Sequence, residues 1–215
     1  MTIFFVTLTD EPTRANHAVA LSMVEQGDVT LFAANATRFR LHSEVQRNGH
    51  DRKIFAMSHG SEDTVVDAAG NAALSTADAT QLIGYKIFSL ACLTGRALGR
   101  DFAANGSTWW GYDTVINAPD ERSPYSGVFS ELLLVLKRNF PNAVDALTTA
   151  QVLAIIKDAC TEAMKRLHEL GASQDRHAMA MYSCCNEIWQ HLCVWLAGES
   201  TPILHPDVPS SSIFG

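Results

Sequence analysis

One cysteine and one histidine draw attention because each follows a short apolar segment and precedes a turn. Cys92 follows segment 86–91 and precedes Leu93-Thr94-Gly95, and His59 follows segment 53–58 and precedes Gly60. Apolar runs of this length that end in small residues predict buried strands opening into tight turns. In open α/β sheets, ligands bind at the carboxyl ends of the strands. Two neighbouring parallel strands would therefore bring the thiol and the imidazole to one edge of a sheet.

A thiol beside an imidazole can carry out nucleophilic chemistry. The imidazole accepts the thiol proton or holds the thiolate in an ion pair, and the thiolate is the reactive form. Acyl transfer also needs hydrogen-bond donors for the developing oxyanion. The backbone amides of Gly60, which has no side chain in the way, and of Cys92, at a predicted strand-to-helix turn, are the candidate donors. Singly, a cysteine in an apolar strand is usually a packing residue and a histidine before glycine a turn residue, so the interpretation depends on the pair.

The elements that would position this pair alternate between strand and helix. Strands are predicted at 2–8, 29–33, 53–58, 86–91 and 107–112. Between them the pattern predicts a turn at Asp10-Glu11-Pro12, a loop or hairpin at 61–71, and helices at 13–26, 36–47, 75–83 and 96–104. Such alternation predicts an α/β fold in which a mainly parallel sheet carries helices on both faces.

The second half of the chain is predicted to be helical. A polar loop at 117–124 has few apolar anchors and is expected to be mobile. It is followed by helices predicted at 128–138, 149–170 and 175–196. The last helix is apolar on more than one face, which indicates a core helix or a contact with a partner. Residues 1–199 are therefore predicted to form one domain, helical from about residue 128, and residues 200–215, rich in proline and serine, an extended tail.

Composition limits the class of protein. The chain of 215 residues is 47% hydrophobic and 18% charged, as expected for a well-packed soluble domain. Its net charge of −7, without a block of Lys or Arg, argues against nucleic acid and anionic membrane surfaces as partners. Neither an apolar run of membrane-spanning length nor a signal-peptide pattern is found. Five irregularly spaced cysteines argue for a reducing compartment, so a cytoplasmic location is expected.

The motifs around the pair resemble those of the caspase-like superfamily of cysteine peptidases. An apolar strand ends in His59-Gly60, a turn at Gly70 precedes a short helix, and a second strand ends in Ala91-Cys92-Leu93-Thr94-Gly95. The pattern Ala-Cys-x-Thr-Gly is similar to that of the CHAT branch, and the resemblance spans about residues 53–112. It implies a three-layer sandwich in which His59 is the general base, Cys92 the nucleophile, and the amides of Gly60 and Cys92 the oxyanion hole. The short interval between His59 and Cys92 leaves little room there for substrate-pocket residues.

Substrate-binding residues are harder to assign. Asp113 and Asp67 lie near the predicted catalytic edge and are candidates for binding a basic P1 side chain, although surface aspartates in loops are more common. Arg96 and Arg100 are the candidates for an acidic P1 side chain, with a solvated helix face as the alternative. Trp109 and Trp110 are neighbours in a predicted strand and therefore face opposite sides of the sheet. One of them, with Trp110 as the candidate, could form the wall of a substrate groove. The alternative is that both Trp109 and Trp110 belong to the core.

No metal or cofactor is expected. The helical histidines have no Cys or His at zinc-ligand spacing, and the four remaining cysteines are interpreted as packing residues. The segment Gly95-Arg96-Ala97-Leu98-Gly99 lacks the residues and spacing of a phosphate-binding loop. The histidines concerned are His168, His177 and His191, and the cysteines are Cys160, Cys184, Cys185 and Cys193.

Three functions remain open on the sequence. The first is a cysteine endopeptidase that cleaves a protein or peptide through the Cys92–His59 dyad and is regulated by an activator or a protein partner at its C-terminal helices. The second is a catalytically silent caspase-like module that binds a partner protein. The third is a doubly wound hydrolase or transferase that uses the same nucleophile on a small thioester or amide. The presence of both reactive groups at one predicted edge favours the first.

Overall fold

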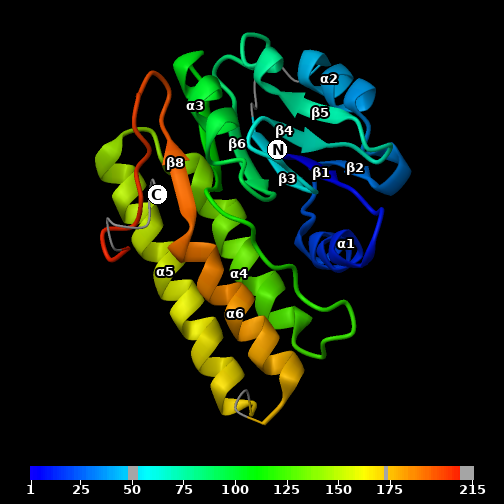
Figure 1. Ribbon diagram of the computed structural model, residues 1–215, viewed down its shortest axis with the longest axis vertical. Coiled ribbons are helices and arrows are strands. Elements are labelled where there is room, and N and C mark those ends of the chain that lie inside the picture. The colour runs from blue at the N-terminus through cyan, green and yellow to red at the C-terminus, as the bar shows by residue number, and fades with distance from the viewer. Residues whose placement is uncertain (48–52, 172–173, 209–215) are drawn as a thin grey trace.

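A six-stranded sheet runs through the centre of the molecule (Figure 1). The computed structural model describes residues 1–47, 53–171 and 174–208. The strand order is β2-β1-β3-β6-β7-β8, in which the first five are parallel and β8 is antiparallel to β7. Their bounds are β1 (Ile3–Val6), β2 (Val29–Phe32), β3 (Lys53–Met57), β6 (Lys86–Leu90), β7 (Thr108–Tyr112) and β8 (Leu192–Trp195).

Helices cover both faces of this sheet, so the fold is a three-layer α/β sandwich, as the alternating pattern predicts. One face packs against α1 (Glu11–Met23), α4 (Ser126–Asn139), α5 (Ala146–Glu169) and α6 (Arg176–Gln190). The other packs against α2 (Arg38–Arg47), α3 (Ala97–Ala104) and a hairpin of β4 (Thr64–Val66) and β5 (Ala72–Ser75). Three short 3₁₀ turns complete the described elements: η1 (Ala33–Asn35), η2 (Thr76–Asp78) and η3 (Phe140–Asn142).

The strands are apolar on both faces because neither face meets water. All four residues of β1 are fully buried. Phe4, Phe55 and Phe88 from three neighbouring strands face the α4–α6 layer, and the rings of Phe55 and Phe88 stack with centroids 4.6 Å apart. This aromatic core holds β1, β3 and β6 in a fixed register, and these are the strands that lead to the residues of interest.

The C-terminal part differs from the prediction in one element. Instead of one helix over 175–196, α6 ends at Gln190 and the chain returns to the sheet as β8. Leu192 and Val194 pack on the side of α4–α6, whereas Cys193 and Trp195 pack on the side of α3. Burial on both faces explains why this segment is apolar all round, a pattern that a buried helix shares.

The tail begins by pairing with β8. The amide of Val194 donates to the carbonyl oxygen of Ile203 at 2.9 Å, and the amide of Ile203 donates back at 2.7 Å. Residues 209–215 of the predicted tail lie outside the described residues. Within the described part of the chain, none of the helices combines the length and the hydrophobicity that a membrane span requires.

Candidate functional site

The structure places His59 and Cys92 at the same edge of the sheet, just beyond the carboxyl ends of two paired parallel strands. Met57 of β3 lies opposite Leu90 of β6, and the amide of Ser58 donates to the carbonyl oxygen of Leu90 at 3.3 Å. The two turns remain in contact beyond the strands. A Cβ atom added at Gly60 would lie 2.9 Å from the carbonyl oxygen of Cys92 and 2.7 Å from Cγ2 of Thr94, so any side chain at residue 60 would push the two turns apart.

The turn after Cys92 is strained. Leu93 has φ of +64°, in the left-handed region that branched, bulky residues rarely adopt. Its amide donates to the carbonyl oxygen of Thr114 at 3.0 Å, and the amide of Gly95 donates to that of Tyr112 at 2.8 Å. Strained backbone of this kind persists where surrounding contacts enforce it and is concentrated at functional sites. Here it occurs one residue after the thiol.

Cys92 is the accessible cysteine of the chain. Its side chain is half-buried, and its Sγ lies 3.8 Å from the carbonyl oxygen of Ile116, to which the thiol can donate. The other cysteines are buried, and all five are free thiols. Burial raises the pKa of Cys184, Cys185 and Cys193 to about 12, and it raises that of Cys160 well above the usual value. These thiols are therefore unreactive at neutral pH, as expected for packing residues.

A carboxylate that the sequence analysis assigned to a turn contacts the histidine. Nε2 of His59 lies 2.5 Å from Oδ2 of Asp10, and both side chains are about half exposed (47% and 45%). Asp10 follows β1, the other neighbour of β3, so three adjacent strands lead to Asp10, His59 and Cys92. Two features of the sequence could have pointed to Asp10: it lies just after an apolar strand, and it lies three residues before Thr13, as a helix cap does.

Asp10 is held in place by the helix that it caps. Its carboxylate accepts a hydrogen bond from the amide of Thr13 at 3.1 Å, and the amide of Asp10 donates to the Thr13 hydroxyl at 3.0 Å, which forms a capping box at the start of α1. Burial acts to raise the pKa of Asp10, but the hydrogen bonds from Thr13 and the His59 ring outweigh it and lower the pKa overall. The carboxylate is therefore charged at neutral pH.

The two amides proposed for the oxyanion hole are not used by the surrounding turns. Gly60 faces Val65 in an isolated bridge, whose hydrogen bonds run from Ser61 to Thr64 and from Val66 to His59. The amide of Gly60 therefore lies outside that pairing. The hydrogen bonds formed among the described residues likewise include no acceptor for the amide of Cys92. Neither amide therefore has a backbone acceptor among the described residues, and their role as an oxyanion hole stays a prediction.

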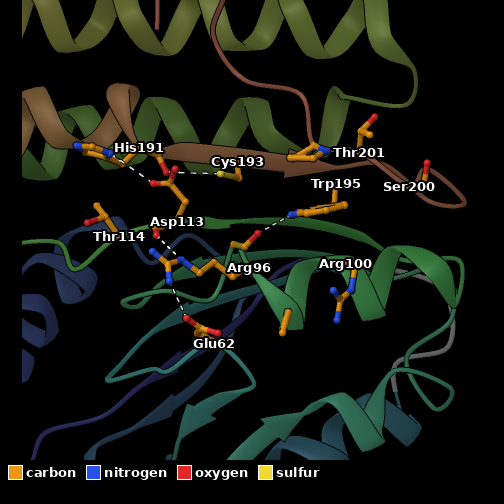
Figure 2. Close-up of a pocket in the computed structure, with 13 residues that line it drawn as sticks. Glu62, Arg96, Arg100, Asp113, Thr114, His191, Cys193, Trp195, Ser200 and Thr201 are labelled. Carbon is orange, nitrogen blue, oxygen red and sulfur yellow. Dashed lines mark hydrogen bonds and ion pairs between the residues drawn. The ribbon is translucent and has the colours of Figure 1, made fainter. Parts of the chain in front are cut away.

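A cavity of about 750 Å³ lies beside the Cys92 turn, on the α3 side of the sheet (Figure 2). Asp113 lines it, with Oδ1 3.4 Å from Nδ1 of His191, and this contact raises the pKa of His191. Cys92 is not among the lining residues. Asp113 thus lies near the predicted edge, but its carboxylate already has a partner, and a role in substrate binding stays a prediction. The charged and aromatic residues of the wall are Glu62, Arg96, Arg100, Asp113, His191 and Trp195.

The burial of Asp67 and Trp110 excludes them from a substrate pocket. Asp67 is 4% exposed, and its carboxylate accepts hydrogen bonds from the amides of Ala69 and Asn71, so it closes the turn between β4 and β5. Trp110 is completely buried in the α4–α6 core, and Trp109 is buried on the opposite face. The prediction is wrong for Asp67 and Trp110, and both tryptophans are core residues.

The described residues contain no cluster of three His, Cys, Asp or Glu side chains arranged to hold a metal ion. Comparisons with protein-family models and with curated proteins give no match for this chain. Among solved structures, it is similar to the crystal structure of gingipain R, an Arg-specific cysteine proteinase. The identity is 13% and the TM-score 0.48, over 85% of this chain and 44% of the gingipain chain, so this chain spans less than half the length of that protein.

Proposed function

We propose that this protein is a caspase-like cysteine endopeptidase of the CHAT type, with Cys92 as nucleophile and His59 as general base. One observation carries the proposal: adjacent parallel strands end at the same edge in His59-Gly60 and in Cys92, with their turns in contact. A single half-exposed thiol among buried ones supports it, because nucleophilic cysteines need solvent access and buried structural ones do not.

The reaction follows from the groups at this edge. His59 takes the thiol proton, and the Cys92 sulfur attacks the carbonyl carbon of the scissile peptide bond. The amides of Gly60 and Cys92 donate hydrogen bonds to the resulting oxyanion. The imidazolium then gives its proton to the leaving amine, which breaks the C–N bond and leaves a thioester on Cys92. A water molecule deprotonated by the same imidazole hydrolyses the thioester and restores the thiol.

Asp10 orients the base. With Nε2 held by the carboxylate, the neutral ring carries its proton on Nε2 and has Nδ1 free to accept the proton of the thiol. The negative charge of Asp10 also stabilises the imidazolium that forms in the first step. Asp10 is therefore a positioning residue, since it acts on the substrate only through His59.

Regulation is part of the proposal. The carbonyl oxygen of Ile116 accepts from the thiol at 3.8 Å, so a shift of the segment that follows β7 would release the thiol for reaction with a substrate. We assign this control to an activator or a protein partner acting through the C-terminal helices. The substrate is a protein or peptide, and the free thiols suit a reducing, cytoplasmic environment.

The same contact favours a second function. A thiol that donates to a main-chain carbonyl oxygen is occupied, as it would be in a catalytically silent module that binds a partner protein. The two functions differ in whether Cys92 forms a covalent bond with a substrate analogue.

Labelling with peptide acyloxymethyl ketones, followed by intact-mass measurement, tests the choice. The peptidase reading predicts one adduct at Cys92, which is absent in Cys92→Ala and strongly slowed in His59→Ala. Because the P1 preference is not assigned, the labels should form a pool with basic, acidic and apolar P1 residues. If the protein remains unlabelled by every member of the pool while ordinary alkylation shows that Cys92 is reachable, the binding module is the better description.

A further inference from the structure

One residue joins three of the loops that leave the candidate catalytic edge. Arg96 closes the Cys92 turn, because its amide donates to the carbonyl oxygen of Leu93 at 3.1 Å. Its Nε donates to the carbonyl oxygen of Asp113, beyond β7, at 2.7 Å. Its Nη1 lies 2.6 Å from Oε1 of Glu62, in the loop that carries His59 (Figure 2). The loops after β3, β6 and β7 therefore meet at one guanidinium.

Glu62 makes a second connection between the same loops. The first amides of a helix have no partner within the helix and favour a nearby negative charge. Arg96, the residue at the start of α3, supplies no side-chain cap, and the amide of Leu98 donates instead to the carbonyl oxygen of Glu62 at 2.7 Å. Glu62 thus meets the start of α3 with its carbonyl oxygen and Arg96 with its carboxylate.

We propose that Glu62 and Arg96 form a positioning clamp that sets His59 at its working distance from Cys92; this inference rests on the proposed function. Glu62 lies three residues after His59, and Arg96 lies four after Cys92. The two side chains are about half exposed (53% and 48%), so their ion pair adds little to the stability of the fold. What the pair fixes is the separation of two turns, and a displacement of about 1 Å can cost a catalytic site roughly 100-fold in rate.

The clamp needs arginine rather than any cation. Arg96 uses Nε for the Asp113 carbonyl oxygen and Nη1 for the Glu62 carboxylate, so two nitrogens of one rigid plane engage two different loops. A lysine presents a single nitrogen on a flexible stem. Arg96→Lys therefore keeps the charge of the pair but gives up one of the two loops.

The test compares alkylation of Cys92 with peptide hydrolysis. Iodoacetamide modification of the folded protein, followed by intact mass, reports on Cys92 because the other thiols are buried. In Arg96→Ala and Glu62→Gln we expect alkylation at pH 7 to slow about tenfold, approaching the rate of His59→Ala. Peptide hydrolysis should lose kcat with little change in KM, whereas the urea midpoint should stay unchanged. The alkylation rate and the kcat of Arg96→Lys should lie between those of the wild type and those of Arg96→Ala.

Arg166→Ala is the matched control. Arg166 pairs with Glu131 between α5 and α4 with comparable exposure of both side chains (43% and 63%), away from the catalytic edge. It should alkylate and hydrolyse like the wild type. There is no clamp if Arg96→Ala is alkylated and hydrolyses peptide at wild-type rates. The same conclusion follows if Arg166→Ala loses as much of both rates as Arg96→Ala does. If His59→Ala itself alkylates at the wild-type rate, the dyad and with it the proposed function are wrong, which is a different outcome.

Discussion

Asp10 has two tasks at once, since one carboxylate caps α1 and contacts the His59 ring. Asp10→Asn separates them, because the amide oxygen can still accept hydrogen bonds from Thr13 while the charge is lost. We expect peptide hydrolysis to fall by roughly 10–100-fold, less than the roughly 100–10,000-fold effect of a general base, because His59 itself remains. The free energy of unfolding should change by less than about 1 kcal/mol. Asp10→Ala should show the same kinetic loss and in addition lose about 1 kcal/mol of stability.

The pH dependence of this cap has a defined sign. Because the pKa of Asp10 is lowered in the folded state, its stabilisation is present above the usual carboxyl pKa and is lost as pH falls through the lowered value. The stability difference between wild type and Asp10→Asn, measured by urea unfolding, should therefore shrink on acidification. Full hydrolytic activity in Asp10→Asn would show that the carboxylate does not orient the base.

Cys92 and Leu90 lie two residues apart and should respond differently to truncation. Leu90 is 4% exposed in the α4–α6 core, so Leu90→Ala leaves a cavity and should cost about 2–5 kcal/mol. Cys92 is half-buried beyond the strand, so Cys92→Ala should abolish hydrolysis and leave the urea midpoint nearly unchanged. His59→Ala should behave in the same way. Comparable destabilisation by Cys92→Ala and Leu90→Ala would mean that Cys92 is a core residue.

At the scale of elements, the segment that follows β7 is held by contacts with α6 and the residue after it. The carboxylate of Asp113 contacts His191, the side chain of Asn117 donates to Glu187 at 2.7 Å, and Asp120 lies 3.0 Å from His177. All three partners belong to α6 or to the residue that follows it. The mobility expected for residues 117–124 stays a prediction. Such movement would require that these contacts with α6 break.

The contact between His191 and Asp113 predicts a pH effect on this anchoring. The nearby Asp113 carboxylate raises the pKa of His191, and Glu187 adds to this effect, whereas burial opposes it. The stabilisation is therefore complete below the usual histidine pKa of about 6.5 and is lost as pH rises through the raised value. His191→Asn should lose more stability at pH 5.5 than at pH 8.5 in urea melts. In an Asp113→Asn background this pH dependence should become smaller, with the remainder due to Glu187. An equal loss of stability at both pH values in the wild-type background would contradict the assignment.

The elements also show which features could be predicted from the sequence. Buried parallel strands are recognisable because they are apolar on both faces. Two of them end in the residue types of a nucleophilic site, so the sequence could predict that His59 and Cys92 lie at the same edge of the sheet. The contact between Asp10 and His59 could not, since it depends on β1 lying beside β3, and strand order is not a local property. Nor could β8 be separated from α6, because an all-apolar segment suits a buried strand and a buried helix equally. Asp67 was predicted to bind a basic P1 side chain because, in the sequence, a carboxylate that closes a turn cannot be told from one that faces a substrate pocket.

At the scale of the whole molecule, β8 connects the outer strand of the sheet to the turn that follows Cys92. The indole Nε1 of Trp195 donates to the carbonyl oxygen of Gly95 at 2.6 Å, and Gly99 in α3 packs directly against the same ring. The outer side of β8 is covered by the start of the tail, through the pair of hydrogen bonds between Val194 and Ile203. An uncovered edge strand would offer its amides and carbonyl oxygens to another chain. The tail thus protects an edge that is tied to the Cys92 turn.

Substitution of Ile203 tests this protection. Ile203→Pro removes the amide that donates to Val194 and should free the edge, so we expect a larger association state than that of the parent, growing with concentration, in light scattering after size exclusion. Ile203→Ala is the control, because it shortens the side chain but keeps both main-chain hydrogen bonds, and its association state should match the parent. Equal association in both variants would assign the effect to the side chain, and none in either would show that the edge is covered by other means. Because Trp195 ties β8 to Gly95, Ile203→Pro should also alter the rate of Cys92 alkylation.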